Sequence, residues 1–138
     1  MTKVSMSANF PVSAKKMWEV IGGFNALPTW HPAIKESKLD AGGRVRTLEL
    51  AGGGSVVERM EKFGEKEHLC SYSILQSPLP IANYLSTIKV KQDDGSKGCT
   101  IEWSSEFAPA GAPEADAIQI VKGIYQAGFD NLKKMFPG

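Results

Sequence analysis

The chain has 138 residues, with 16 lysine and arginine side chains against 15 aspartate and glutamate side chains, for a formal net charge of +1. This length and the 42% hydrophobic content fit a single domain over residues 1–138 with a substantial core. The balanced charge, without a basic block, argues against nucleic acid and anionic membranes as partners, and no apolar run approaches the roughly 20 residues of a membrane span.

The first part of the chain predicts one strand and two helices. Alternating apolar and polar residues indicate a strand over residues 3–9. Ser13 is a suitable N-cap for a helix over residues 14–21, which a Gly-Gly pair ends. A second, shorter helical piece is expected over residues 24–30.

Six strands are predicted next, because alternating segments are separated by short turns rich in glycine, proline and aspartate. Connections this short favour antiparallel neighbours. The expected strands cover residues 34–40, 44–51, 55–63, 67–75, 83–91 and 98–107.

The last predicted element is an amphipathic helix over residues 114–136. Its apolar stripe, with a spacing of 3, 4, 4, 3, 4, consists of Ile118, Val121, Tyr125, Phe129, Leu132 and Phe136. Such a helix must bury this stripe, and the preceding antiparallel sheet is the available partner. We therefore predict an α+β domain of order β-α-α-β6-α. A curved sheet of about seven strands wraps around the helix and leaves a hollow for a small molecule.

Strand alternation predicts which side chains face this hollow. Arg46 shares a face with Leu48, and Glu58 shares one with Val56. A three-residue loop, Gly52–Gly54, would pair Leu48 with Glu58 and would place Arg46 diagonally from Glu58, within reach of a salt bridge. Buried charges require partners, so the two side chains form a self-satisfied pair, a polar handle for a ligand, or both.

The remaining strands and the helix add further candidate wall residues. Alternation turns inward the side chains of Tyr72, Tyr84 and Ser86. In the last strand it turns Trp103 inward and Glu102 outward, although a bulge would reverse part of this pattern. Gly128 interrupts the apolar face of the helix at a cost of about 1 kcal/mol relative to alanine. It permits close helix–sheet packing or leaves room for a ligand.

The sequence contains few groups suited to catalysis or metal binding. Cys70 and Cys99 lie in separate strands without the spacing of metal ligands, so we expect reduced thiols and predict neither a metal nor a cofactor. His31 and Glu58 are weak candidates for a general base, and a structural role is the alternative for His31. We expect Trp30 to plug one end of the hollow.

The N-terminal residues lack the apolar core of a signal peptide, so a cytoplasmic protein is expected. The expected partner is a small hydrophobic or amphipathic ligand. Neither nucleic acid nor integral membrane association is predicted. The chain is expected to be a monomer or a homodimer.

Five short motifs follow one another along the chain, namely Trp30–Ile34, Gly43–Leu48, Val57–Met60, Leu69–Ile74 and Pro80–Tyr84. Their order and spacing resemble the START-like helix-grip superfamily (SRPBCC), in its polyketide cyclase/dehydrase and lipid-transport branch. The resemblance covers nearly the whole chain and implies a helix-grip fold with an internal cavity. It consists of a pattern of positions and contains no catalytic signature.

Within that superfamily, the middle of the chain is similar to the plant abscisic acid receptors. This similarity implies that Lys35 occupies the position that holds a ligand carboxylate. It implies polar or water-mediated ligand contacts for Glu58, Tyr84 and Ser86. The receptors' gate and latch sequences are replaced by Ala51–Gly54 and Ser77–Ile81, so a hormone-gated surface for a partner protein is not expected.

These patterns together predict binding of a small hydrophobic molecule with a polar end, with transport or sequestration as an extension of that binding. The alternative is a polyketide cyclase/dehydratase-type enzyme acting on an aromatic or polyketide-like substrate, with His31 or Glu58 as the base. A third hypothesis is an interaction module that uses the loops at residues 52–54 and 78–80. The expected ligand contacts are Trp30, Lys35, Arg46, Leu48, Glu58, Tyr72, Tyr84, Ser86, Trp103, Val121, Tyr125 and Gly128.

Overall fold

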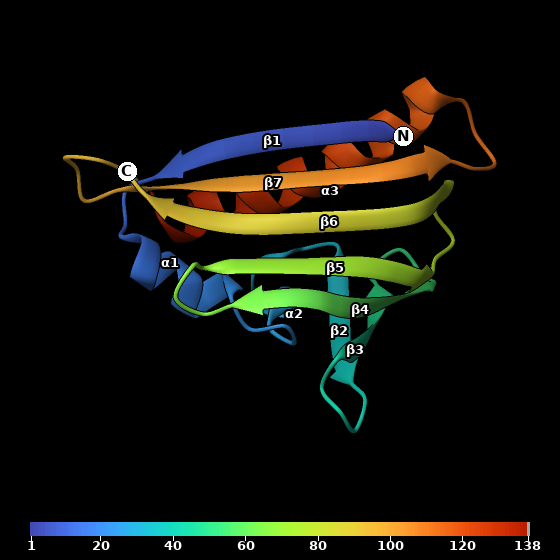
Figure 1. Cartoon of the computed structure of the whole chain (residues 1–138), viewed down its shortest axis with the longest axis horizontal. Coiled ribbons are helices and arrows are strands. Elements are labelled where there is room, and N and C mark those ends of the chain that lie inside the picture. Colours follow the sequence, from blue (N-terminus) through green and yellow to red (C-terminus); the bar gives the residue numbers. More distant parts are fainter. Residues whose placement is uncertain (138) are drawn as a thin grey trace.

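In the computed structural model, which describes residues 1–137, a seven-stranded antiparallel sheet curves around one long helix (Figure 1). The strand order β1-β7-β6-β5-β4-β3-β2 places the first strand beside the last. This arrangement confirms the predicted α+β helix-grip fold. The elements are β1 (Thr2–Phe10), α1 (Ala14–Ile21), α2 (Leu27–Trp30), β2 (Ile34–Leu39), β3 (Val45–Leu50), β4 (Ser55–Gly64), β5 (Leu69–Gln76), β6 (Ile81–Gln92), β7 (Cys99–Pro109) and α3 (Glu114–Met135).

The two short helices between β1 and β2 are bounded by local hydrogen bonds. The Ser13 side chain accepts a hydrogen bond from the backbone N–H of Lys16 at 3.1 Å, which confirms it as the N-cap of α1. At the other end, a Cβ atom on Gly22 would lie 2.5 Å from the Trp18 indole, so only glycine fits there. α2 begins at Leu27, later than predicted, because a turn precedes it.

Helix α3 packs across β1 and β7, at one side of the sheet, and Figure 1 shows it behind these two strands. Its apolar stripe packs inward as predicted, with Val121, Tyr125 and Leu132 completely inaccessible to solvent and with Ile118 and Phe136 half-buried. The β2–β5 part of the sheet curves away from this contact. The helix therefore covers one half of the concave face directly and faces the other half across a gap.

The β3–β4 hairpin differs in register from the prediction. Arg46 lies directly opposite Glu58, and Leu48 lies opposite Val56, so the pairing is shifted by two residues. The turn includes Leu50, whose N–H donates to the carbonyl oxygen of Gly54 at 3.0 Å. The loop is therefore longer than the three glycines alone, and the shift converts a diagonal Arg46–Glu58 contact into a direct cross-strand pair.

Strand β7 resolves the orientation that the sequence left open. Trp103 faces the helix and is 3% exposed. Glu102 lies on the outer face, where its carboxylate is 3.3 Å from the ammonium group of Lys91. The alternation of inward and outward side chains is thus uninterrupted in this part of β7, and the Trp103 indole lies in the interior.

The two cysteines provide a test of this core. Cys70 in β5 and Cys99 in β7 are free and buried, and burial raises the pKa of each thiol to about 11. Because the thiolate is the reactive form, we expect neither thiol of the folded protein to react with Ellman's reagent at pH 8 within minutes. Both should react at once in guanidinium chloride. Rapid modification of either thiol in the native protein would contradict the packing described.

Candidate functional site

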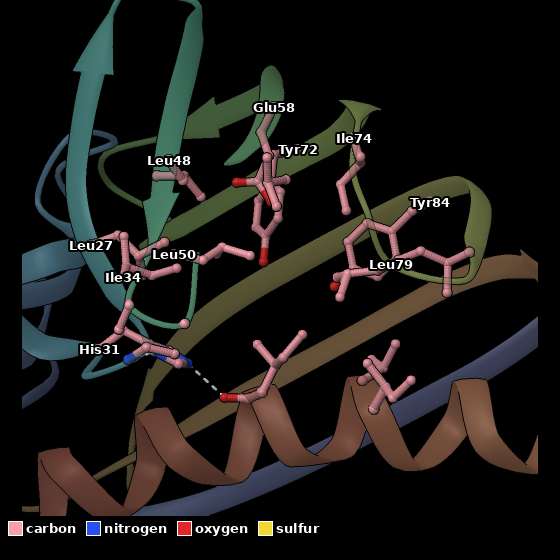
Figure 2. A pocket seen from close by; sticks show the side chains of 18 of the residues that line it. Leu27, His31, Ile34, Leu48, Leu50, Glu58, Tyr72, Ile74, Leu79 and Tyr84 are labelled. Atoms are coloured by element: carbon pink, nitrogen blue, oxygen red, sulfur yellow. Dashed lines mark hydrogen bonds between the residues drawn. The ribbon is translucent and has the colours of Figure 1, made fainter. Parts of the chain in front are cut away.

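A cavity of about 350 Å³ occupies the gap between α3 and the curved part of the sheet (Figure 2). This volume lies in the usual range of small-molecule sites. The lining comes from the strands β2 to β7, from α3, and from α2 with the segment that follows it. Most of the lining is aliphatic, including Leu27, Ile34, Leu48, Leu50, Val56, Ile74, Leu79, Ile81, Ile120, Val121 and Ile124.

The cavity brings together several of the residues that the sequence proposed as ligand contacts. Those that line it are Leu48, Glu58, Tyr72, Tyr84, Trp103 and Val121. They come from five strands and the helix, and strand alternation turns the five strand residues to the concave side. Their contact with a ligand stays a prediction.

Arg46 and Glu58 form a buried ion pair at the sheet end of the cavity. The Arg46 Nε and Nη2 atoms both contact Glu58 Oε1, at 2.8 and 2.7 Å, and Nη1 donates to the carbonyl oxygen of Phe24 at 2.6 Å. The guanidinium carbon also lies over the rings of Phe24 and Tyr72, at 4.1 and 5.0 Å from their centroids. Each guanidinium nitrogen thus makes one contact within the protein, and Arg46 does not line this cavity. The structure therefore favours the self-satisfied pair over a direct ligand contact by Arg46.

Glu58 differs from its partner because its carboxylate reaches the cavity wall. Oε1 accepts both bonds from Arg46, whereas Oε2 has no hydrogen-bond partner among residues 1–137. Burial raises the pKa of the Glu58 carboxyl, and the charge and hydrogen bonds of Arg46 oppose this effect. Oε2 therefore offers an unused acceptor in an otherwise apolar space.

Tyr125 and Ser86 lie behind the cavity wall. The Tyr125 ring stacks on Trp103 with centroids 4.3 Å apart and an interplanar angle of 17°. Its hydroxyl is 2.6 Å from the Tyr84 hydroxyl and 2.9 Å from Ser86 Oγ. Burial raises the pKa of the Tyr72, Tyr84 and Tyr125 phenols, so all three remain protonated at neutral pH. Tyr125 and Ser86 therefore do not line the cavity as predicted. They hold the Tyr84 hydroxyl in place through hydrogen bonds.

His31 lines the cavity but has no free ring nitrogen. Nδ1 accepts a hydrogen bond from the Ala33 N–H at 3.2 Å, so Nε2 carries the proton and donates it to the Ile124 carbonyl oxygen at 2.7 Å (dashed line in Figure 2). Burial lowers the pKa of His31, against the raising effect of the Ile124 carbonyl. This neutral imidazole ties the segment after α2 to the middle of α3, which is the structural role.

Gly128 and Trp30 belong to an aromatic contact outside the cavity wall. A Cβ atom on Gly128 would lie 3.0 Å from ring carbons of His31 and Trp30 and 3.1 Å from one of Trp103. The glycine therefore serves close packing, and the alternative of space for a ligand is wrong. It also lets the His31 ring approach the carbonyl of Ile124, one helical turn earlier. Trp30 fills the interior beside this contact, with its ring 5.6 Å from Trp103.

Lys35 does not reach the cavity. It is solvent-exposed and sits in an irregularity of β2, where the register with β3 shifts between Ile34 and Glu36. The irregularity interrupts the strand alternation at Lys35, whose side chain is exposed. The carboxylate-binding role implied by the family resemblance is therefore not available to this side chain.

Sequence reasoning missed the helical residues nearest the cavity, Ile120 and Ile124. They flank the main stripe of α3 and form a second apolar pair four residues apart. Because α3 rests on β1 and β7, its main stripe is used for packing, and this flank turns toward the gap. The sequence did contain a signal for these two residues. The apolar stripe of the helix is wider than a single packing contact with the sheet requires.

Two further observations concern residues 1–137. This part of the chain holds no cluster of three or more histidine, cysteine, aspartate or glutamate side chains placed to bind a metal ion. None of its helices is long and apolar enough to cross a membrane.

A curved antiparallel sheet, a long C-terminal helix and an apolar cavity between them define a helix-grip fold with an internal cavity. A family model described as "Polyketide cyclase / dehydrase and lipid transport" matches residues 1–136, and the chain belongs to this family. No protein of curated function matches the chain.

Solved structures show the same fold. The protein XoxI from Bacillus cereus is 42% identical, with a TM-score of 0.95 over 99% of this chain and 96% of that one. A putative uncharacterized protein from Bacillus thuringiensis has the same identity and TM-score over 99% of this chain and all of the other. A START superfamily protein from Mycobacterium smegmatis is 13% identical, with a TM-score of 0.80 over 97% and 96% of the two chains, and shows the fold alone.

The packing role of Gly128 is tested by comparing two glycines of α3. Gly123→Ala meets no atom within 4 Å, so it should stabilise the protein by up to ~1 kcal/mol through helix propensity. Gly128→Ala should instead destabilise it, because overpacking against three aromatic rings costs about 1–3 kcal/mol. Urea unfolding of both variants measures the difference. Equal stabilisation by the two substitutions would show that Gly128 does not serve close packing.

The buried, neutral state of His31 predicts a pH dependence of stability. Its folded-state pKa lies below the ordinary 6.5, so its contribution is complete above pH 6.5 and is lost as the pH falls through the folded-state value. In His31→Gln, the free energy of unfolding should fall less steeply below pH 6.5, by up to ~1.4 kcal/mol per pH unit. Because Glu58 contributes with the opposite sign, the comparison is between variant and parent. Identical slopes for the two proteins would contradict the prediction.

Proposed function

We propose that this protein binds a small, mainly hydrophobic molecule with one polar end in the cavity between α3 and the sheet. The observation that carries the proposal is the preformed cavity of about 350 Å³ with an almost entirely apolar lining. Burial of apolar ligand surface would supply affinity at roughly 25 cal/mol per Å². Membership of a family whose description includes lipid transport supports the same reading.

Two loops form the rim of the cavity and are suited to ligand entry. Gly52 and Gly53 from the β3–β4 loop and Leu79 from the β5–β6 loop line it. The loops meet, since a Cβ atom on Gly54 would lie 3.7 Å from the Pro78 ring. Positive φ angles at Gly53 and Gly54 favour glycine, which leaves these two positions of the β3–β4 loop without side chains. This placement supports a role of the loops in ligand entry over the hypothesis of an interaction module.

A cyclase or dehydratase remains the second candidate, because one specific feature favours it. Glu58 Oε2 lies unpartnered at the cavity wall and is within reach of a bound substrate, as a general base must be. His31 is a poor candidate for that role, since both of its nitrogens are hydrogen-bonded to backbone. Binding precedes catalysis in either case, so the first test concerns binding.

Binding is tested with N-phenyl-1-naphthylamine, a neutral dye whose fluorescence rises in apolar surroundings. We expect saturable binding of one dye per chain. Val121→Phe, which places extra carbons in the cavity, should weaken binding at least fivefold. Ile118→Phe is the matched control, because Ile118 lies on the same helix outside the cavity wall. Melting temperatures of both variants establish that each is folded.

Two outcomes would contradict the proposal. The folded parent protein fails to bind the dye, or both substitutions weaken binding equally. Native mass spectrometry of freshly purified protein complements the titration, because a co-purified molecule would be displaced by the dye.

A further inference from the structure

The hydrogen bonds around the cavity fix which polar groups remain for a ligand. The starting point is Ser86, whose single hydroxyl proton goes to the Ser104 carbonyl oxygen at 3.1 Å. The other contacts of Ser86 Oγ, with Tyr125 Oη at 2.9 Å and with Trp103 Nε1 at 3.2 Å, must therefore donate to it. Since the Tyr125 proton is used in this way, the 2.6 Å contact between tyrosines has Tyr84 as its donor.

With these donors assigned, the Tyr84 hydroxyl can only accept a hydrogen bond from a ligand, whereas the Tyr72 hydroxyl can donate one. Tyr84 has given its proton to Tyr125, so its oxygen can only accept a hydrogen bond from the cavity. Tyr72 Oη accepts from Trp103 Nε1 at 3.0 Å, and its hydroxyl also lies near Ser86 Oγ. Because Ser86 Oγ already accepts from Tyr125 and Trp103, the Tyr72 proton is left for the cavity. Figure 2 shows the Tyr72 hydroxyl directed from the sheet toward α3. Tyr72 is thus a free donor at the wall.

The charge at the wall is negative and has no spare cation. Among the described residues that line the cavity, Glu58 is the one acidic group, and the two contacts from Arg46 to Oε1 favour its ionised form, whereas both nitrogens of His31 are used by backbone groups in the neutral state. Arg46 lies behind this glutamate, outside the lining of the cavity and paired with it and the Phe24 carbonyl, and Lys35 is exposed outside. A ligand carboxylate would therefore meet Glu58 Oε2 without a counter-charge, which is costly in an apolar space.

We propose that the polar end of the ligand is an uncharged hydroxyl group, which donates to Glu58 Oε2 or Tyr84 Oη and accepts from Tyr72. This inference rests on the proposed function and adds its polar specificity. The cavity wall offers one donor, the Tyr72 hydroxyl, and two acceptors, Glu58 Oε2 and Tyr84 Oη. A ligand hydroxyl can use both kinds of group, because it donates and accepts. An ether oxygen can only accept from Tyr72, and a ligand carboxylate would bring a second negative charge next to Glu58. The site thus selects fatty alcohols or similar alcohols over fatty acids.

The test uses four ligands with the same ten-carbon chain. Decanol, decyl methyl ether, decylammonium and decanoate compete with N-phenyl-1-naphthylamine for the parent protein at pH 7.5. Burial alone would favour the ether over the alcohol. We expect decanol to bind about tenfold more tightly than the ether, because a hydrogen bond to a charged acceptor is worth at least that factor. We also expect decylammonium to bind more tightly than decanoate, although both are charged.

Variants assign these preferences to residues. Tyr72→Phe should weaken decanol and the ether by the same factor, because both accept from the Tyr72 hydroxyl. Glu58→Gln should reduce the penalty on decanoate. If this variant does not fold because Arg46 loses its partner, the ligand series on the parent protein decides alone. The ether binding as tightly as decanol, or decanoate binding as tightly as decylammonium, would overturn this inference while leaving cavity binding intact. Failure of the dye itself to bind would instead overturn the proposed function.

Discussion

The contact between Trp103 and Tyr125 sets the geometry on which the rest of the interior depends. Their parallel stacking at 4.3 Å holds α3 against β7, and the strands beyond β6 then curve away from the helix. The same two side chains carry the hydrogen bonds that lead to Tyr72, Tyr84 and Ser86. One stacked pair thus determines both where the cavity opens and how the hydroxyls on its wall are oriented.

A second tie, from His31 to the carbonyl oxygen of Ile124, closes the cavity from the other side. Gly128 makes this tie possible, because a side chain there would collide with the imidazole and two indoles. Burying a histidine, an ion pair and several phenols in a small domain costs free energy unless each group is hydrogen-bonded. Here most of those bonds connect elements far apart in sequence. These hydrogen bonds keep an apolar cavity open, whereas hydrophobic packing alone would tend to fill it.

The elements of this fold could be predicted from periodicity and turn chemistry, because those signals are local. The inward direction of Tyr72, Tyr84 and Trp103 followed from strand alternation. The predictions that failed depended on non-local or irregular structure. The turn that includes Leu50 shifted the pairing of β3 with β4, and the irregularity at Lys35 turned a proposed ligand contact outward. No sequence pattern states how a buried hydroxyl is oriented, so the division between a ligand contact and its support, as for Tyr84 and Tyr125, required the structure.

Methyl NMR with decanol tests whether a ligand occupies the hollow between α3 and the sheet. We expect saturable shifts of the Leu48, Leu79 and Val121 methyl signals, with nuclear Overhauser contacts to the decyl chain. The Leu85 methyl signals should not change, because Leu85 is exposed on the opposite face of the sheet. Shifts centred on Leu85, or no shift of the cavity methyls at saturating decanol, would show that the hollow does not hold the ligand.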